Sequence, residues 1–227
     1  MPKTKNIGGY PFIEYQPPRF SETESLRRSS HFCEWLTGRR SVRDFSDKPV
    51  SIEILNNILV AASSAPSGAN KQPWTFCVVS EPHLKKQIRI EAEKEEYESY
   101  HNRMGEAWLE DLRPLQTDWQ KPFLEIAPWL IIVFKKAYDI HPAGSKRNNY
   151  YVSESVGIAC GFLIAAIHNA GLCTLTHTPS PMNFLTRILK RPENERPYLL
   201  LPVGYPADET FVPDISRKKL SDVTVFY

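Results

Sequence analysis

The segment 152–169 constrains the fold of this chain most, because it is helix-prone and apolar over much of its circumference. A helix that is apolar on more than one side must be covered on several sides, and the sheet and a second subunit are the candidates for covering it. Gly171 follows as the expected C-cap. The apolar residues that recur along this segment are Val156, Ile158, Ala159, Phe162, Leu163, Ala166 and Ile167.

Helix-prone and strand-prone segments alternate along the chain, which predicts a layered α/β or α+β fold. The strongest strand signal is the β-branched run 128–135, which we expect near the centre of the sheet. Residues 1–20 show no clear period and are expected to form a surface arm, which leaves 21–227 as the folded domain. Further strands are expected at 74–80, 172–178 and 198–203, and further helices at 21–36, 52–62 and 183–189.

An arginine-rich stretch, 37–45, follows the first expected helix. If its backbone is extended, Arg39, Ser41 and Arg43 point to one face, whereas Arg40 and Val42 point to the other. Two guanidinium groups and a hydroxyl on one face could hold a phosphate, because arginine donates parallel hydrogen bonds and stays charged. A solvated basic turn is the alternative interpretation of these residues.

Two further segments have unusual compositions. Residues 65–70 form a loop of small residues, where the backbone could approach a planar ligand closely; an ordinary loop is the alternative. The segment 81–105 is helix-prone and charged, and its apolar stripe fades after Glu93. We expect this weakly anchored segment to order over a ligand, although its charges taken alone fit a solvated helix.

Composition excludes several functional classes. The 28 basic and 26 acidic side chains give a net charge of +2, which is no signature of a nucleic-acid-binding protein. The four cysteines form no Cys-x-x-Cys pair and the six histidines no His-x-x-x-His pair, so we expect neither disulfides nor a metal. No Gly-x-Gly-x-x-Gly loop suggests a nicotinamide-binding Rossmann domain. Residues 1–15 lack a signal core, and the apolar run 156–167 is shorter than the roughly 20 residues of a membrane span. We therefore expect a cytoplasmic protein without a membrane partner.

Several motifs resemble the flavin-dependent nitroreductase superfamily. They are Arg-Arg-Ser-Val-Arg at 39–43, Ala-Pro-Ser-Gly-Ala at 65–69 and Leu-Pro-Val-Gly-Tyr-Pro at 201–206. Within it, the chain resembles the iodotyrosine deiodinase branch through Glu96, Tyr100 and the residues that follow them as far as Lys121. The resemblance implies an α+β nitroreductase-like fold, with a mixed central sheet flanked by helices, an intertwined homodimer, and a substrate lid at about 93–122.

The resemblance implies FMN as the cofactor. Its polar tail would be held by residues 39–43, with Arg217 returning to the phosphate, and its ring would contact a loop of the partner subunit. Thr178 would be the catalytic residue, with its hydroxyl near the reactive nitrogen of the flavin. The implied FMN-binding residues are Arg39, Arg40, Ser41, Val42, Arg43, Pro66, Ser67, Gly68, Thr176, His177, Thr178 and Arg217.

The resemblance also implies a halogenated tyrosine as the substrate. Glu96 would bind the ammonium group, and Lys121 and Tyr100 the carboxylate; Glu96 and Tyr100 share a helix face at a spacing of four. The backbone N–H of Ala69 would hold the phenolate oxygen. The implied reaction converts iodotyrosine to tyrosine and iodide with electrons from reduced FMN, one at a time, and NAD(P)H or a reductase would be the electron source.

Three points stay open at this stage. An NAD(P)H-dependent nitroreductase or flavin oxidoreductase, using two-electron hydride transfer, would need the same FMN site. It would not need Glu96, Tyr100 and Lys121, which we call the clamp because they would bind the amino acid zwitterion. A flavin-storage protein without turnover is a further alternative. His177 stands between the two threonines either as a proton donor or, as we favour, as a structural histidine that points away from the flavin.

Overall fold

The computed structural model describes residues 2–141 and 144–227, which fall into two compact units that divide after Arg39. The first unit contains an antiparallel hairpin, β1 (Thr4–Ile7) and β2 (Tyr10–Ile13), and helix α1 (Glu22–Thr37). Ser21 caps α1 by accepting the N–H of Glu24 at 3.2 Å. The hairpin was not predicted within the expected arm, because its strands have only four residues each and show no clear period. The arm as a separate segment stays a prediction.

The second unit is built on a four-stranded sheet in the order β3-β4-β8-β7. The strands are β3 (Trp74–Val79), β4 (Trp129–Lys136), β7 (Cys173–Thr174) and β8 (Glu195–Gly204), and they pair antiparallel. The β-branched run is central, as predicted. A parallel bridge between Ser41 and Thr174 at the β7 edge makes the pairing mixed.

The strand β7 is shorter than the predicted 172–178, although the chain keeps its register along β8. Thr174 pairs with Val203, and His177 pairs in the same register with Leu200 through two hydrogen bonds of 2.9 and 3.1 Å. Between these pairs, the partner of Leu175 in this register is Pro202, which has no N–H to donate. The ladder is therefore interrupted at one position, and the extended path continues.

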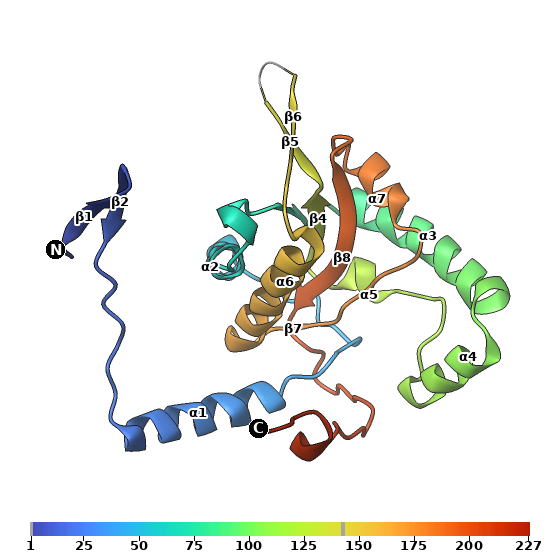
Figure 1. The fold of residues 1–227 in the computed structure, drawn as a ribbon. Helices are drawn as coiled ribbons and strands as arrows, with labels where there is room; N and C mark the ends of the chain where they lie inside the picture. Colours follow the sequence, from blue (N-terminus) through green and yellow to red (C-terminus); the bar gives the residue numbers. More distant parts are fainter. Residues whose placement is uncertain (1, 142–143) are drawn as a thin grey trace. The chain divides into compact units, whose positions relative to one another are not determined.

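Helices cover both faces of the sheet (Figure 1). Helices α2 (Ile52–Ser63) and α6 (Val152–Asn169) pack on one face, whereas α3 (Pro82–Glu98), α5 (Phe123–Ile126) and α7 (Asn183–Ile188) pack on the other. Side chains of β4 alternate between two cores, as a period of two requires. Ile131 and Val133 belong to the first core, and Leu130, Ile132 and Phe134 to the second.

Helix α6 begins and ends at the predicted residues, and one side of it is buried against the sheet and α2. Ile158 and Phe162, on another side, are each 44% exposed in the single chain. By length and mean hydropathy alone, α6 could cross a membrane, but the central helix of a soluble domain meets the same test. Its buried residues Val156, Ala159, Leu163 and Ile167 belong to the first core.

The chain between α3 and α5 forms an excursion from the second helical layer. α3 continues into a wider, π-helical turn over Ser99–Arg103, which is followed by α4 (Glu106–Leu112) and a 3-10 turn at Arg113–Leu115. No residue of α4 is buried. The remaining elements are a second hairpin of β5 (Tyr138–Ile140) and β6 (Lys146–Asn148), and 3-10 turns at Gly68–Asn70 and Leu220–Asp222.

Candidate active site

The arginine stretch is extended and attached to the edge of the sheet. The N–H of Val42 donates to the carbonyl of Thr174 at 3.2 Å, and the Val42 side chain is buried in the second core. Ser41 and Arg43 therefore point away from that core and remain half-buried. The Arg40 guanidinium donates to the carbonyl of Pro213, which ties the C-terminal segment to this stretch. Arg39 belongs to the first unit, so the described site begins at Arg40.

The three residues expected to bind the zwitterion lie together. The Nζ of Lys121 is 3.5 Å from Oε2 of Glu96 and 5.4 Å from the centre of the Tyr100 ring. Lys121 also donates to the carbonyl of Asp118 and, at 3.4 Å, to the hydroxyl of Thr117. The side chains of Lys121 and Glu96 are only 5% and 12% exposed. The chain thus returns from the excursion directly onto the α3 face that carries Glu96.

Burial moves the ionisable groups of this cluster towards their neutral forms. It raises the pKa of Glu96 and lowers the pKa of Lys121, and in each case the charge of the other residue opposes the shift. Burial likewise raises the pKa of Tyr100. The charge of Arg43 acts on Tyr100 and Lys121, which places the arginine stretch within electrostatic reach of the clamp. A buried ion pair of this kind gains little over its desolvation cost.

His177 lies beneath the clamp as a neutral ring. Its Nδ1 is 3.9 Å from Oε1 of Glu96, and Phe123 packs edge-on against it at 5.8 Å between ring centres. Burial, followed by the charges of Lys121 and Arg43, lowers the pKa of His177 to about 3. Its Nε2 is buried and has no hydrogen-bond partner among the residues that the structure describes. A ring of this kind is poorly suited to donate a proton near pH 7.

The threonines on either side of His177 are exposed, so Thr176 and Thr178 point away from it. Arg217 is exposed in the C-terminal segment that Arg40 holds through Pro213. The edge of the sheet therefore presents Arg43 and the hydroxyls of Ser41, Thr176 and Thr178, from two distant parts of the chain. This donor set matches the chemistry of a phosphate ester.

The loop of small residues lies on the other side of the sheet, after α2 (Figure 1). The N–H of Gly68 donates to Ser155 of α6 at 3.3 Å. A Cβ at Gly68 would come within 2.9 Å of the Tyr150 carbonyl, so this position needs glycine. Ala69 is held at a φ of 50°, with its side of the loop exposed. Pro66 is exposed as well, and Ser67 uses its hydroxyl to accept the N–H of Gln72 at 2.9 Å. Within one chain the sheet separates this loop from the clamp.

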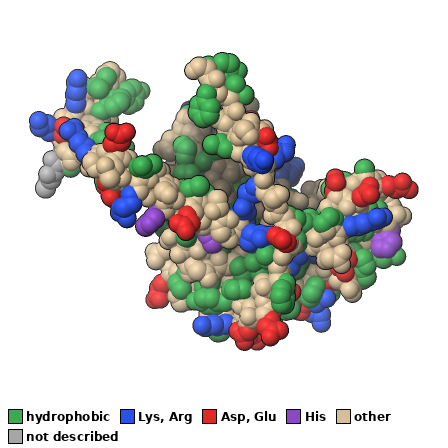
Figure 2. All heavy atoms as spheres, turned by 90° about the horizontal axis from the view of Figure 1, so that it is seen from below, with side chains coloured by type: hydrophobic (Ala, Val, Ile, Leu, Met, Phe, Trp, Pro, Cys, Tyr) green, Lys and Arg blue, Asp and Glu red, His purple; other side chains and the backbone are tan. Residues whose placement is uncertain are grey.

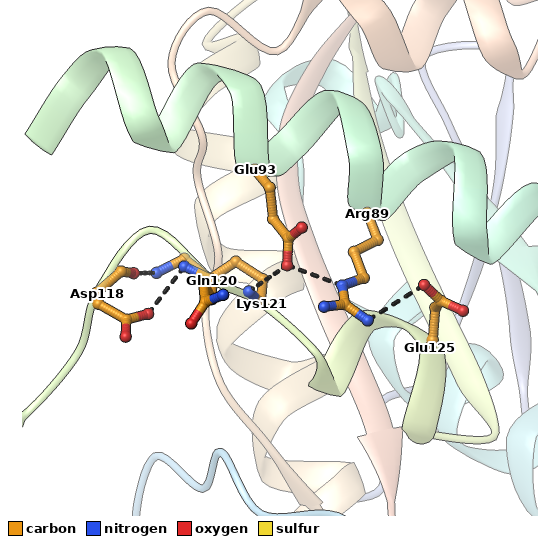
Figure 3. Close-up of polar contacts among 6 residues, drawn as sticks. All are labelled: Arg89, Glu93, Asp118, Gln120, Lys121 and Glu125. Carbon is orange, nitrogen blue, oxygen red and sulfur yellow. Dashed lines mark hydrogen bonds and ion pairs between the residues drawn. The ribbon is translucent and has the colours of Figure 1, made fainter.

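The sequence did not single out the polar network that supports the clamp. Oε1 of Glu93 accepts the backbone N–H of Lys121 and Nε of Arg89, each at 2.7 Å, and Arg89 reaches Glu125 at 3.3 Å (Figure 3). The one available signal was the spacing of Arg89 and Glu93, which are four apart on one helix. The hydrogen bond from the Lys121 backbone could not be predicted from the sequence, because every residue except proline carries a backbone N–H.

Comparisons with known proteins place these features in a family. The model described as the nitroreductase family matches residues 36–205. The iodotyrosine deiodinase of Haliscomenobacter hydrossis is 61% identical over 95% of this chain and 97% of its own length. The iodotyrosine deiodinase of Danio rerio is 47% identical over 95% of this chain and 73% of its own length.

Solved structures agree with these matches. A crystal structure of oxidized iodotyrosine deiodinase bound to FMN and 3-iodo-L-tyrosine superimposes with a TM-score of 0.74 at 33% identity, covering 86% of this chain and 98% of that chain. A BluB-like flavoprotein from Clostridium difficile 630 superimposes with a TM-score of 0.65 at 23% identity, over 86% of this chain and 98% of that chain. The second match shows the fold alone. The expected nitroreductase-like α+β fold is confirmed.

Proposed function

Because the chain belongs to the nitroreductase family and, within it, to the iodotyrosine deiodinases, we propose that it is an FMN-dependent enzyme that reductively deiodinates halotyrosines. The observation that carries this proposal is the buried cluster of Glu96, Tyr100 and Lys121. A carboxylate, a hydroxyl and an ammonium in one place complement the charged groups of a free amino acid. A general nitroreductase has no need of such a clamp.

The residues at the edge of the sheet fit FMN. Arg40, Ser41 and Arg43, with the backbone at Val42, would hold its polar tail, and Arg39 and Arg217 would complete the phosphate contacts. The exposed hydroxyls of Thr176 and Thr178 lie along the adjoining segment, where they can donate to a flavin ring. We assign His177 to the support of this segment through its backbone pairing with Leu200. Bound FMN would supply the electrons of the reaction.

A second copy of the chain would complete the site. Pro66, Ser67 and Gly68 are proposed to contact the flavin, yet their loop follows α2 on the face of the sheet opposite to the clamp. The loop of a second copy can reach the flavin on the clamp side of the sheet, whereas the chain's own loop cannot. Exposed apolar side chains also gather on the face shown in Figure 2, as expected of a surface that a partner covers. We therefore propose an intertwined homodimer.

The clamp would bind its substrate by exchanging partners. The ammonium of the amino acid replaces Lys121 beside Glu96, and the carboxylate of the amino acid takes the released Lys121. The Tyr100 hydroxyl donates to the same carboxylate, and the backbone N–H of Ala69 holds the phenolate oxygen. Since Glu96 and Lys121 are already buried, much of their desolvation cost is met before the substrate arrives.

The remaining steps belong to the lid and to Thr178. Closure of the lid, residues 93–122, over the substrate would exclude water and fix the carbon–iodine bond. Replacing that bond by a carbon–hydrogen bond consumes two electrons, one at a time, and one proton, and releases iodide. We propose that the Thr178 hydroxyl hydrogen-bonds to the flavin and thereby tunes this transfer. NAD(P)H or a partner reductase would be the electron source, in the cytoplasm.

Direct assay tests this proposal. Purified protein with FMN and dithionite should convert 3-iodotyrosine to tyrosine and release one iodide per tyrosine, measured by chromatography and an iodide electrode. Nitroaromatic turnover with NAD(P)H is the comparison reaction. If iodotyrosine stays intact while nitroaromatics are reduced well, the proposal is wrong and the nitroreductase alternative holds.

A further inference from the structure

Lys121 is attached to α3 at two points one helical turn apart. Its ammonium meets Glu96 at 3.5 Å, and its backbone N–H donates to Glu93 at 2.7 Å. Glu93 and Glu96 are three residues apart and therefore share a helix face. Helix α3 therefore contacts Lys121 both at its side-chain ammonium and at its backbone N–H.

The hydrogen bond from the Lys121 N–H to Glu93 is more buried and better supported than a surface contact. The Glu93 side chain is 16% exposed, and its Oε1 accepts both the Lys121 N–H and the Arg89 guanidinium at 2.7 Å. Arg89 bonds in turn to Glu125, which lies in α5 just beyond the end of the lid (Figure 3). A carboxylate that accepts from a backbone N–H makes one of the stronger hydrogen bonds in proteins.

The two attachments would behave differently when the substrate binds. The exchange described above draws the Lys121 ammonium away from Glu96, because the carboxylate of the amino acid competes for it. The bond from the Lys121 N–H to Glu93 involves no group that contacts the substrate, so it persists. After the exchange, this bond keeps the Lys121 backbone beside α3.

We propose that Glu93, oriented by Arg89, is a positioning residue that presets the backbone of Lys121 for binding the carboxylate of the substrate. This inference rests on the proposed function, since it assumes that Lys121 binds a halotyrosine. Without Glu93, the segment 117–121 must be ordered at the moment of binding, and the loss of conformational freedom then weakens affinity.

The test compares Glu93→Ala with Glu91→Ala in the FMN-loaded protein. Glu91 is a matched control, because it lies on α3 with two ion-pair partners, Lys94 and Arg187, neither of which belongs to the clamp or to the segment 117–121. Titration of the flavin absorbance with 3-iodotyrosine gives Kd. Glu93→Ala should raise this Kd about tenfold to hundredfold, which corresponds to loss of a hydrogen bond to a charged group. Glu91→Ala should leave it within about twofold.

Further readouts separate positioning from general stability. In Glu93→Ala, the Kd for FMN and the kcat for nitroaromatic reduction should stay at the wild-type values, whereas KM for iodotyrosine rises. Glu93→Gln keeps an oxygen that can accept the Lys121 N–H, so it should restore part of the lost affinity. If Glu93→Ala does not fold, Glu93→Gln and Arg89→Met decide the question, and each should weaken iodotyrosine binding without loss of FMN.

Three outcomes would overturn the inference. One is an unchanged iodotyrosine Kd in Glu93→Ala when Glu96→Gln weakens binding strongly, which leaves the proposed function standing. Another is a loss of FMN affinity as large as the loss of iodotyrosine affinity, which assigns Glu93 a structural role. The last is wild-type protein that binds FMN but not iodotyrosine, and this outcome removes the proposed function as well.

Discussion

His177 shows how burial can determine the role of a single residue. A histidine between two threonines at a flavin edge invites the interpretation of a proton donor. The structure instead buries the ring beside Phe123, and this burial, followed by the charges of Lys121 and Arg43, lowers its pKa to about 3. The histidine is therefore neutral under physiological conditions. This agrees with the structural role favoured from the sequence.

This lowered pKa predicts a specific pH dependence of stability. The unfolded state protonates His177 near pH 6.5, whereas the folded state does so only near pH 3, so unfolding takes up a proton between these values. The free energy of unfolding should therefore fall as the pH falls from about 6.5, by up to about 1.4 kcal/mol per pH unit from this group. Urea unfolding from pH 4 to 8 measures it. His177→Gln should make the free energy of unfolding depend less on pH, whereas His83→Gln, at an exposed histidine, should leave that dependence unchanged. Parallel plots of unfolding free energy against pH for wild type and His177→Gln would contradict the prediction.

The lid differs from the other elements in how it is anchored. α4 buries no residue, and Trp108 within it is 58% exposed. The connection to the rest of the fold is concentrated at Arg103, which donates to the Ser180 carbonyl at 2.6 Å, and at Lys121. An element with so little buried surface opens at low free-energy cost.

A halotyrosine should therefore protect the lid from hydrogen exchange. We expect 3-iodotyrosine to slow exchange over residues 105–117 by about tenfold or more, while residues 82–92 in the buried part of α3 change little. Mass spectrometry of the FMN-loaded protein measures both segments. 2-Iodophenol, which has the ring and the halogen but no zwitterion, is the control and should give little protection. Equal protection by both ligands would mean that ring stacking, not the clamp, orders the lid.

Elements with a strong period or a cap could be predicted from the sequence, and others could not. The helices expected at 21–36, 52–62 and 152–169 are present as α1, α2 and α6. The strands of the hairpin β1–β2 have four residues each, which is too short for a clear period in the sequence. The charges at Glu96 and Lys121 suggested a clamp once the family resemblance was noticed. The bond between Glu93 and the Lys121 backbone could not be foreseen, because every residue but proline carries that N–H.

At the scale of the whole molecule, the sheet divides the proposed site. The clamp lies with α3 and α5 on one face, and the loop 65–69 lies with α2 and α6 on the other. No small movement within one chain carries that loop across a packed sheet. Completion of the site by a second copy is the arrangement that needs no rearrangement of the core.

The exposed side of α6 offers the test of this arrangement. Ile158 and Phe162 are one turn apart and each 44% exposed, although the helix that carries them is otherwise a core element. Ile158→Asp with Phe162→Asp should therefore give a monomer near 26.1 kDa by light scattering. Because the partner's loop is proposed to contact the flavin, that monomer should also lose the visible absorbance of bound FMN. Ile90→Asp, at a residue 43% exposed on α3, is the matched control and should stay dimeric and yellow. A double variant that is monomeric yet retains FMN would show that each chain binds its flavin alone, and the loop 65–69 would then need another role.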